Sequence, residues 1–174
     1  MNENAYGGKT VLITGGTGSF GHTVARSLLQ RDVGEIRILS RDEEKQDAMR
    51  HAFGDSRLRF YVGDIRDEGS VERAVKSVDY VFHAAALKQV PSCEFFPMEA
   101  VRTNVVGTEN VVRASDHAGV SSVVCLSTDK AVYPVNAMGM SKALMEKVAQ
   151  SFGLNNRAAE TIVSCVRYGN VMYS

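Results

Sequence analysis

Short apolar runs alternate with longer amphipathic segments along the whole chain, which is the pattern of repeated strand–helix units that build a parallel sheet. A parallel strand is buried on both faces, so it is expected as a run of Val, Ile and Leu bounded by turn residues. Six such runs are predicted as strands: Thr10–Thr14, Glu35–Ser40, Leu58–Val62, Tyr80–Ala84, Ser122–Ser127 and Thr161–Arg167. The pattern predicts an α/β protein with a doubly wound parallel sheet of about six strands in a three-layer α/β/α arrangement.

Segments between the strands carry apolar residues at helical spacing. This spacing predicts helices over Phe20–Gln30, Pro97–Ala118 and Val135–Phe152. The last of them has Asn136 as its predicted N-cap and Gly153 at the position where a glycine ends a helix. No internal repeat or linker interrupts the sequence, so residues 1–174 are expected to form one domain.

The charges of the chain balance, with 20 Lys and Arg against 20 Asp and Glu in 174 residues. This balance argues against a nucleic-acid partner, which a basic surface would indicate. No apolar run is long enough to span a membrane, and the start of the chain lacks the features of a signal peptide. The three cysteines have neither metal-like nor disulfide-like spacing. We therefore expect a cytoplasmic protein with reduced thiols and no metal site.

A glycine-rich segment follows the first predicted strand and opens the first predicted helix. Its glycines fit two spacings, GxGxxG and GxxGxxG, in which the backbone turns tightly and approaches a pyrophosphate at a helix N-terminus. The missing Gly-Lys-Ser/Thr ending excludes a P-loop. The motif predicts a Rossmann-type dinucleotide-binding domain with these contact residues at the turn: Gly15, Gly16, Thr17, Gly18, Ser19, Phe20 and Gly21.

The end of the second predicted strand indicates which dinucleotide binds. An acidic residue at this tip binds the ribose 2′-hydroxyl of NAD, but here Ser40 occupies the place and Arg41 follows. Arginine pairs well with a phosphate, so NADP is the predicted cofactor and NAD is kept as the alternative. In the other interpretation Arg41 is an ordinary solvated residue and Asp42 reaches the ribose. The later strand tips add further predicted cofactor contacts: Asp64, Ile65, Ala84, Ala85, Ala86 and Lys88.

Candidate catalytic residues lie at the fifth predicted strand and in the helix after it. The strand ends in Thr128, Asp129 and Lys130, which place a hydroxyl, a carboxylate and an amine at the ligand side of the sheet. The following helix carries Met138 and Lys142 one turn apart, so both face the same side. A hydroxyl, an acid and two amines near a nicotinamide site are groups that can move protons during a hydride transfer.

Three stretches of the chain resemble one enzyme family: His83–Pro91, Asn104–Asn110 and Ser127–Lys142. From Lys9 onward the sequence is similar to the extended short-chain dehydrogenase/reductase superfamily. Within it, the chain resembles the inverting UDP-N-acetylglucosamine 4,6-dehydratases of bacterial capsule and O-antigen synthesis, which also epimerise C5. The resemblance implies a UDP-sugar substrate, a homo-oligomer in the full-length enzyme, and a C-terminal substrate lobe that is absent here. It also implies that Asn104 steadies the cofactor site.

The resemblance further implies a mechanism in which hydride leaves sugar C4 for the bound cofactor and returns to C6. In that mechanism Lys130 takes the C5 proton, and Asp129 protonates the departing C6 hydroxyl. Thr128 hydrogen-bonds the C4 oxygen. Lys142 binds the nicotinamide ribose and supplies positive charge.

Met138 stands where the wider superfamily has a tyrosine base, four residues before the lysine. A thioether has no proton to give, so this substitution leaves several interpretations open. Met138 is a packing residue in an enzyme that uses another base, for which Tyr133 offers a nearby phenol. Alternatively, the chain is a noncatalytic NADP-binding or sensing protein of the same fold, a retaining nucleotide-sugar dehydratase, or a nucleotide-sugar 4-epimerase.

Overall fold

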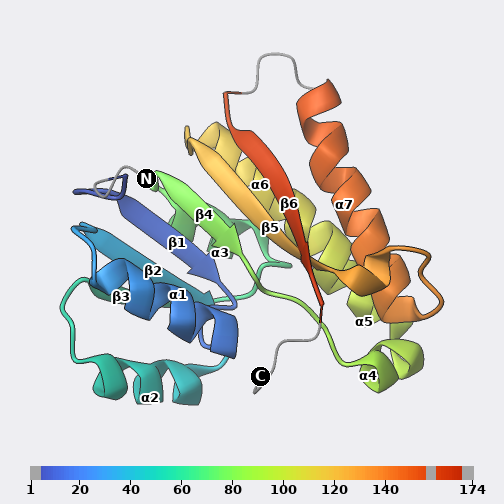
Figure 1. Ribbon diagram of the computed structural model, residues 1–174, viewed down its shortest axis with the longest axis horizontal. Coiled ribbons are helices and arrows are strands. Elements are labelled where there is room, and N and C mark those ends of the chain that lie inside the picture. Colours follow the sequence, from blue (N-terminus) through green and yellow to red (C-terminus); the bar gives the residue numbers. More distant parts are fainter. Residues whose placement is uncertain (1–4, 156–159, 170–174) are drawn as a thin grey trace.

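The computed structural model describes residues 5–155 and 160–169, which form a parallel sheet of six strands with helices on both faces (Figure 1). The strands are β1 (Thr10–Thr14), β2 (Glu35–Ser40), β3 (Leu58–Val62), β4 (Tyr80–His83), β5 (Ser122–Thr128) and β6 (Ile162–Tyr168). They lie in the order β3-β2-β1-β4-β5-β6, and every neighbouring pair is parallel. The predicted doubly wound sheet is confirmed, and each strand end lies within about one residue of its predicted position.

The helices of these ranges alternate with the strands. They are α1 (Ser19–Leu29), α2 (Glu43–Phe53), α3 (Glu68–Val75), α4 (Val90–Phe95), α5 (Pro97–Ala100), the π-helical turn η1 (Val101–Val106), α6 (Gly107–His117), the 3-10 turn η2 (Asp129–Ala131) and α7 (Ala137–Asn155). Neither α2 nor α3 is among the predicted helices. They begin where the carboxylates of Asp42 and Asp67 accept backbone N–H groups of the first turn. None of the described helices is long and apolar enough to cross a membrane.

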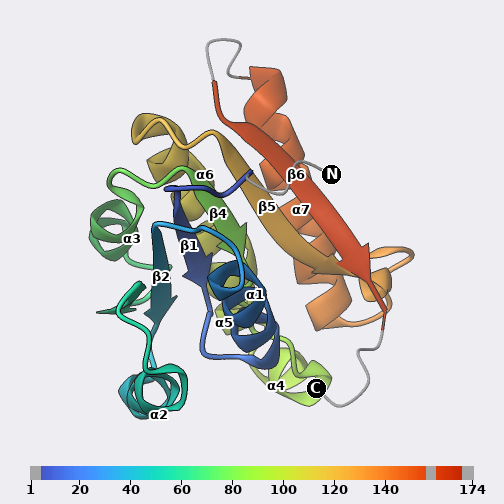
Figure 2. The ribbon, with the colours of Figure 1, turned by 60° about the vertical axis from the view of Figure 1, so that its left-hand side comes forward.

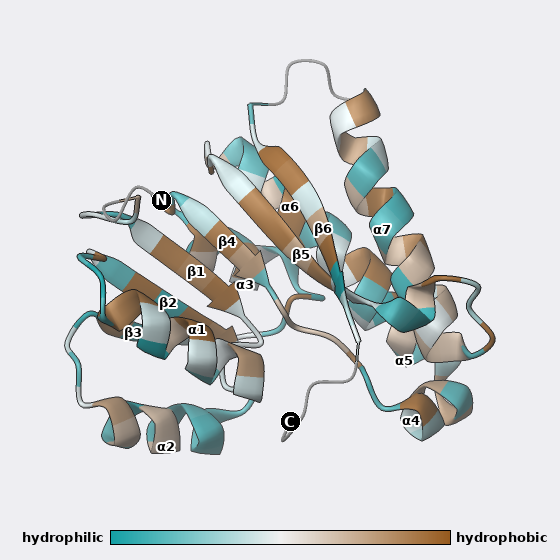
Figure 3. Cartoon of the chain, in the orientation of Figure 1, coloured by the Kyte–Doolittle hydropathy of each residue, from teal (hydrophilic) through white to brown (hydrophobic). Residues whose placement is uncertain are grey.

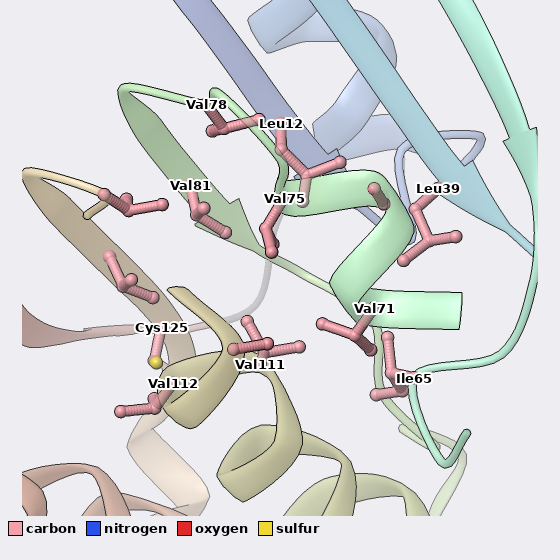
Figure 4. Close-up of a cluster of buried hydrophobic side chains, with 14 of the residues drawn as sticks. Leu12, Leu39, Ile65, Val71, Val75, Val78, Val81, Val111, Val112 and Cys125 are labelled. Atoms are coloured by element: carbon pink, nitrogen blue, oxygen red, sulfur yellow. The ribbon is translucent and has the colours of Figure 1, made fainter. Parts of the chain in front are cut away.

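Helices cover both faces of the sheet and give it two hydrophobic cores (Figure 2). On one face α1 and α2 pack against the strands through Leu28 and Met49. On the other face α3, α6 and α7 pack against them, and Figure 4 shows Val75 near Leu12 in this larger core. The central strands β1 and β5 are accordingly largely brown in Figure 3, whereas the helices show both brown and teal. The three-layer arrangement is confirmed.

The predicted helical stretch over Pro97–Ala118 is present to within one residue, but it is not one regular α-helix. The segment is divided into α5, η1 and α6, and the middle part has π-helical geometry. A π turn holds one more residue than an α turn. Here it contains Asn104, a fully buried amide that bonds to the backbone of Leu87 outside the helix. Apolar spacing alone cannot reveal this extra residue, because both kinds of turn keep one apolar face.

The predicted ends of the last helix are half right. Asn136 Oδ1 accepts a hydrogen bond from the N–H of Gly139 at 2.8 Å, so the predicted N-cap is confirmed. The prediction that Gly153 ends the helix is wrong, because α7 continues to Asn155. A glycine ends a helix by adopting a left-handed backbone, and Gly153 is not among the described glycines with positive φ.

The strand order places the candidate site at the carboxyl ends of the strands. The chain builds the sheet from β1 outward to β3 and from β4 outward to β6, so its direction reverses between β1 and β4. Ligands of open parallel sheets bind at the carboxyl ends of the strands next to such a reversal. The glycine turn follows β1, the Ala84–Ala86 segment follows β4, and Thr128 ends β5. The predicted site residues therefore gather at these carboxyl ends.

Candidate active site

The glycine turn between β1 and α1 has no room for a side chain at Gly15 or Gly21. Gly15 has a left-handed φ of 64°, and a Cβ there would lie 2.7 Å from the backbone of Ala85. A Cβ on Gly21 would collide with the carbonyl oxygen of Gly16. Gly18 is the N-cap of α1 and makes no side-chain cap, so the N-terminus of this helix can receive an anion. The turn can thus hold a diphosphate against bare backbone.

Asp42 and Arg41, the two residues predicted to contact the ribose or its 2′-phosphate, have different surroundings at the tip of β2. The Asp42 carboxylate accepts the backbone N–H of Lys45 at 3.0 Å and pairs with its Nζ at 2.8 Å. These bonds lower the pKa of Asp42. Arg41 has a half-exposed side chain, and its guanidinium lies 3.5 Å from the carboxylate of Asp64. Behind it, Thr17 donates to Ser40 Oγ at 3.2 Å and ties the glycine turn to β2.

Asp64, which follows β3, belongs to a charged chain that the sequence spacing does not reveal. Arg66 binds the Asp64 carboxylate through two nitrogens at 2.8 and 2.6 Å, and its third nitrogen binds Glu99 of α5 at 2.7 Å. Burial raises the pKa of Asp64, but the hydrogen bonds from Arg66 outweigh this effect and the pKa lies below its usual range. The carboxylate is therefore ionised beside Arg41, at the edge where an adenosine ribose would lie.

Asn104 holds the loop after β4 in place. Its Oδ1 accepts the N–H of Leu87 at 2.8 Å, and its Nδ2 donates to the Leu87 carbonyl at 2.9 Å. The same Nδ2 donates to Ser141 Oγ at 2.9 Å, and Ser141 donates to the Met138 carbonyl at 2.8 Å. Asn104 is fully buried, so it steadies the site by linking this loop to α7.

Thr128, Asp129 and Lys130 form one hydrogen-bonded group at the tip of β5. Thr128 Oγ1 donates to Asp129 Oδ1 at 2.9 Å and accepts the N–H of Lys130 at 3.3 Å. Lys130 Nζ lies 3.4 Å from the same carboxylate oxygen. The hydrogen bond from Thr128, with the neighbouring Lys130, lowers the pKa of Asp129. The three side chains that were predicted to carry the chemistry therefore meet.

Lys142 lies beneath this group on α7. Its Nζ donates to the carbonyl of Leu126 in β5 at 2.8 Å, and the residue is only 7% exposed. Burial lowers the pKa of Lys142 from 10.5 to about 8, although the nearby Glu146 carboxylate opposes the shift. A lysine in this state holds its proton weakly near neutral pH, as a group that assists proton transfer must.

Met138 lies one turn before Lys142 and faces an apolar cluster. It is 5% exposed and packs with Cys93 and Ala100 of α4 and α5. This contact supports the interpretation of Met138 as a packing residue, and a catalytic role for it stays a prediction. Tyr133, the candidate phenol, has a left-handed φ of 50° and is 92% exposed.

A family model described as polysaccharide biosynthesis protein matches residues 11–174. The chain belongs to this family. It is 57% identical over 170 residues to a UDP-glucose 4-epimerase of Rickettsia bellii, covering 95% of this chain and 50% of that protein. The chain therefore spans about half the length of the curated relatives it matches.

Two solved structures extend the comparison. The X-ray structure of Pen from Bacillus thuringiensis is 39% identical, with a TM-score of 0.94, and the match covers 97% of this chain and 52% of that one. DesIV from Streptomyces venezuelae, a dTDP-glucose 4,6-dehydratase with NAD and TYD bound, is 28% identical, with a TM-score of 0.76, over 90% of this chain and 55% of that one. Both epimerases and dehydratases of nucleotide sugars are thus similar to this member of the polysaccharide biosynthesis family, and a nicotinamide cofactor is supported.

The remaining predicted residues have less direct places in this family member. Ile65 is buried in the larger core, where its side chain packs close to Gly107, and Lys88 is exposed in the loop before α4. No group of three or more metal-ligating side chains occurs in residues 5–155 and 160–169.

The sequence does not single out Glu146, a buried carboxylate that Arg167 of β6 binds at 2.6 and 2.8 Å. Its position one turn after Lys142 is the signal that could have revealed it.

Proposed function

We propose that this chain is the cofactor-binding part of a nucleotide-sugar 4,6-dehydratase that acts on UDP-N-acetylglucosamine and inverts C5. The observation that carries the proposal is the hydrogen-bonded group of Thr128, Asp129 and Lys130 at the tip of β5. Oxidation at C4 alone needs one base, whereas dehydration also needs a base for C5 and an acid for the C6 oxygen. This group offers both in addition to a hydroxyl for C4.

The glycine turn supports a nicotinamide dinucleotide, and the tip of β2 favours NADP. The bare backbone around Gly15 and Gly21 fits a diphosphate, and bound nicotinamide would accept and return the hydride. The Asp42 carboxylate already accepts a hydrogen bond from the backbone N–H of Lys45 at the start of α2. Arg41 has a half-exposed guanidinium that can pair with a 2′-phosphate. Lys142 would bind the nicotinamide ribose from below.

The pKa of Asp129 suggests how its acid role depends on substrate. In the free site Thr128 donates to Asp129, which keeps the carboxylate ionised and unable to give a proton. If Thr128 donated its hydrogen bond to the sugar C4 oxygen instead, the Asp129 carboxylate would lose this stabilisation and its pKa would rise. Lys130, as the neutral amine, would take the C5 proton and pass it to the Asp129 carboxylate 3.4 Å away, and Asp129 would give this proton to the C6 hydroxyl that leaves as water. Asp129 would thus become an acid only with the sugar in place.

A 4-epimerase is the second candidate, because the Rickettsia bellii relative is named as one. An epimerase returns the hydride to the other face of C4 and leaves C5 and C6 untouched. It would need Thr128 and Lys142 but not the acid and base pair of Asp129 and Lys130. The two candidates therefore differ in which side chains are essential.

The deciding experiment incubates the complete protein with UDP-N-acetylglucosamine, and separately with UDP-glucose, in deuterated water. A dehydratase gives a product lighter by one water molecule with deuterium at C5, whereas an epimerase gives an isomer of equal mass without deuterium. Lys130→Ala should abolish deuterium entry, and Lys147→Ala, an exposed lysine of α7, serves as the matched control. An isomer of equal mass would overturn the dehydratase in favour of the epimerase. No product from either sugar would favour the noncatalytic NADP-binding protein.

A further inference from the structure

A buried histidine joins three elements behind the cofactor site. His83, the last residue of β4, is 2% exposed. Its Nδ1 lies 2.6 Å from the hydroxyl of Thr14 at the end of β1, and its Nε2 lies 2.9 Å from the hydroxyl of Thr108 in α6. Neither threonine is more than 1% exposed, so both contacts are sealed from water. The proposed mechanism uses none of these three side chains.

The hydrogen bonds determine which ring nitrogen carries the proton. Thr108 has one hydroxyl proton and donates it to the carbonyl of Asn104 at 2.7 Å. Its oxygen must then accept from His83, so the proton is on Nε2 and Nδ1 is an acceptor. Thr14 donates to this Nδ1. Burial, with repulsion from Lys142, lowers the pKa of His83 to about 3, which agrees with a neutral ring.

Both ends of this hydrogen-bonded chain reach the segment that follows β4. With its proton directed to His83, the Thr14 oxygen turns a lone pair to the N–H of Ala85 and accepts it at 3.3 Å. At the other end, the Asn104 carbonyl is fixed by Thr108, and the Asn104 amide holds Leu87. The segment between Ala85 and Leu87 is thus fastened on both sides through one imidazole.

The fastened segment lies where the glycine turn is closest to β4. A Cβ on Gly15 would come within 2.7 Å of Ala85, so the two backbones are already in contact. A small displacement of Ala85 would narrow or widen the space between the glycine turn after β1 and the segment after β4. The spacing between these two backbones therefore depends on the Thr14 hydroxyl and, through it, on His83.

We propose that His83, as the neutral Nε2–H tautomer, is a positioning residue that sets the distance between the Ala84–Ala86 segment and the glycine turn for a bound nicotinamide dinucleotide. The inference rests on the proposed cofactor site but assigns a role to a residue outside it. His83 touches neither the cofactor nor the sugar in this arrangement, and it acts through Thr14.

A matched pair of isosteric substitutions separates positioning from simple structural support. Thr14→Val removes the hydroxyl between His83 and Ala85, and Thr161→Val removes a buried hydroxyl that donates to the Val120 carbonyl at 2.7 Å. Thr161 directly precedes β6, so it lies at the amino end of this strand, whereas the site lies at the carboxyl ends of the strands. Thr14→Val loses the short bond to His83 and the longer one from Ala85, and Thr161→Val loses one short buried bond, so both remove a buried hydroxyl that is hydrogen-bonded.

Titration calorimetry of the complete protein with NADP⁺ and NAD⁺ gives the first readout. We expect Thr14→Val to weaken binding of the preferred nucleotide about tenfold and Thr161→Val to change it less than about twofold. Equal effects of the two variants, or none, would overturn the positioning role while leaving the cofactor site intact. Failure of the unsubstituted protein to bind either nucleotide would overturn the proposed function and this role with it.

Nitrogen NMR of the histidine rings gives a second readout that a change in stability does not move. The His83 ring, assigned by its loss in His83→Asn, should show a protonated Nε2 and an unprotonated Nδ1 at every pH from about 5 to 8. His83→Asn keeps an acceptor near Thr14, so it should retain most of the nucleotide affinity, whereas His83→Leu should lose it. A ring that titrates in this range, or one protonated at Nδ1, would overturn the assignment.

Discussion

The buried ammonium of Lys142 should make the stability of the protein rise between neutral and alkaline pH. In the unfolded chain the group has its ordinary pKa of 10.5, and in the folded protein burial lowers the pKa to about 8. Below pH 8 the amine is charged in both states, and the folded state bears the full cost of burying the charge. Between pH 8 and 10.5 the unfolded chain binds more protons than the folded one, so the free energy of unfolding rises with pH.

The size of this rise follows from the two pKa values. At roughly 1.4 kcal/mol per pKa unit, the fall from 10.5 to about 8 corresponds to about 3 kcal/mol. Lys142→Met keeps the length and volume of the side chain but removes the charge, so it should remove the rise. The difference in stability between the two proteins should therefore change by about 3 kcal/mol across the window.

Urea unfolding at a series of pH values from 7 to 11 measures this difference over the whole window. Titration of the tyrosines affects both proteins and cancels in the comparison. The measured difference includes the interactions that Lys142 makes with Cys125, Cys165 and Glu146, because these groups lie close to its amine. Lys147→Met, at an exposed position of the same helix, is the control and should run parallel to the unsubstituted protein. Parallel curves for Lys142→Met as well would refute the reasoning, because they would show that the ammonium is not held in the buried position beside Leu126.

Three further predictions concern the cofactor site. Met138→Ala should cost about 2–3 kcal/mol of stability by leaving space beside Cys93 and Ala100, as seen in thermal unfolding, and calorimetry should show unchanged nucleotide binding. Arg41→Ala should weaken NADP⁺ binding at least about tenfold and spare NAD⁺, and equal affinities before and after the change would contradict the NADP assignment. Gly21→Ala should abolish binding of both nucleotides, because its Cβ would collide with the Gly16 carbonyl; calorimetry that finds normal affinity would be the contrary result.

The strands could be predicted from the sequence because a strand that is buried on both faces needs apolar residues at consecutive positions. Val11, Leu12 and Ile13 of β1 are all 0% exposed, as expected of a central strand that helices cover on both faces. The helices α2 and α3 could not be found in this way. In α2 only Gln46 and Met49 are buried, and one of them is polar, while α3 has only 8 residues and so offers barely two turns of helical pattern. The capping carboxylates Asp42 and Asp67 were their only clear signal.

The candidate site could be predicted only as far as its residues are neighbours in the sequence. The Thr128–Lys130 group and the pair on α7 were predicted because a strand tip and a helical turn bring such residues together. The contact between Thr14 and His83 joins residues 69 positions apart, and that between Arg66 and Glu99 joins residues 33 apart. Contacts of this kind depend on strand order and helix packing, which a local pattern does not contain.

The π-helical turn η1 fixes the length of the chain between α5 and α6. Each residue of an α-helix turns it by roughly 100°, and a π turn accommodates one residue more. Deleting a single residue within Val101–Val106 would let this stretch close into a regular helix and rotate α5 by roughly 100° against α6. Asn104 could then no longer face both Leu87 and Ser141. Related proteins should therefore keep the residue count here even where the residues differ, and an alignment that opens a gap in this turn has misplaced the asparagine.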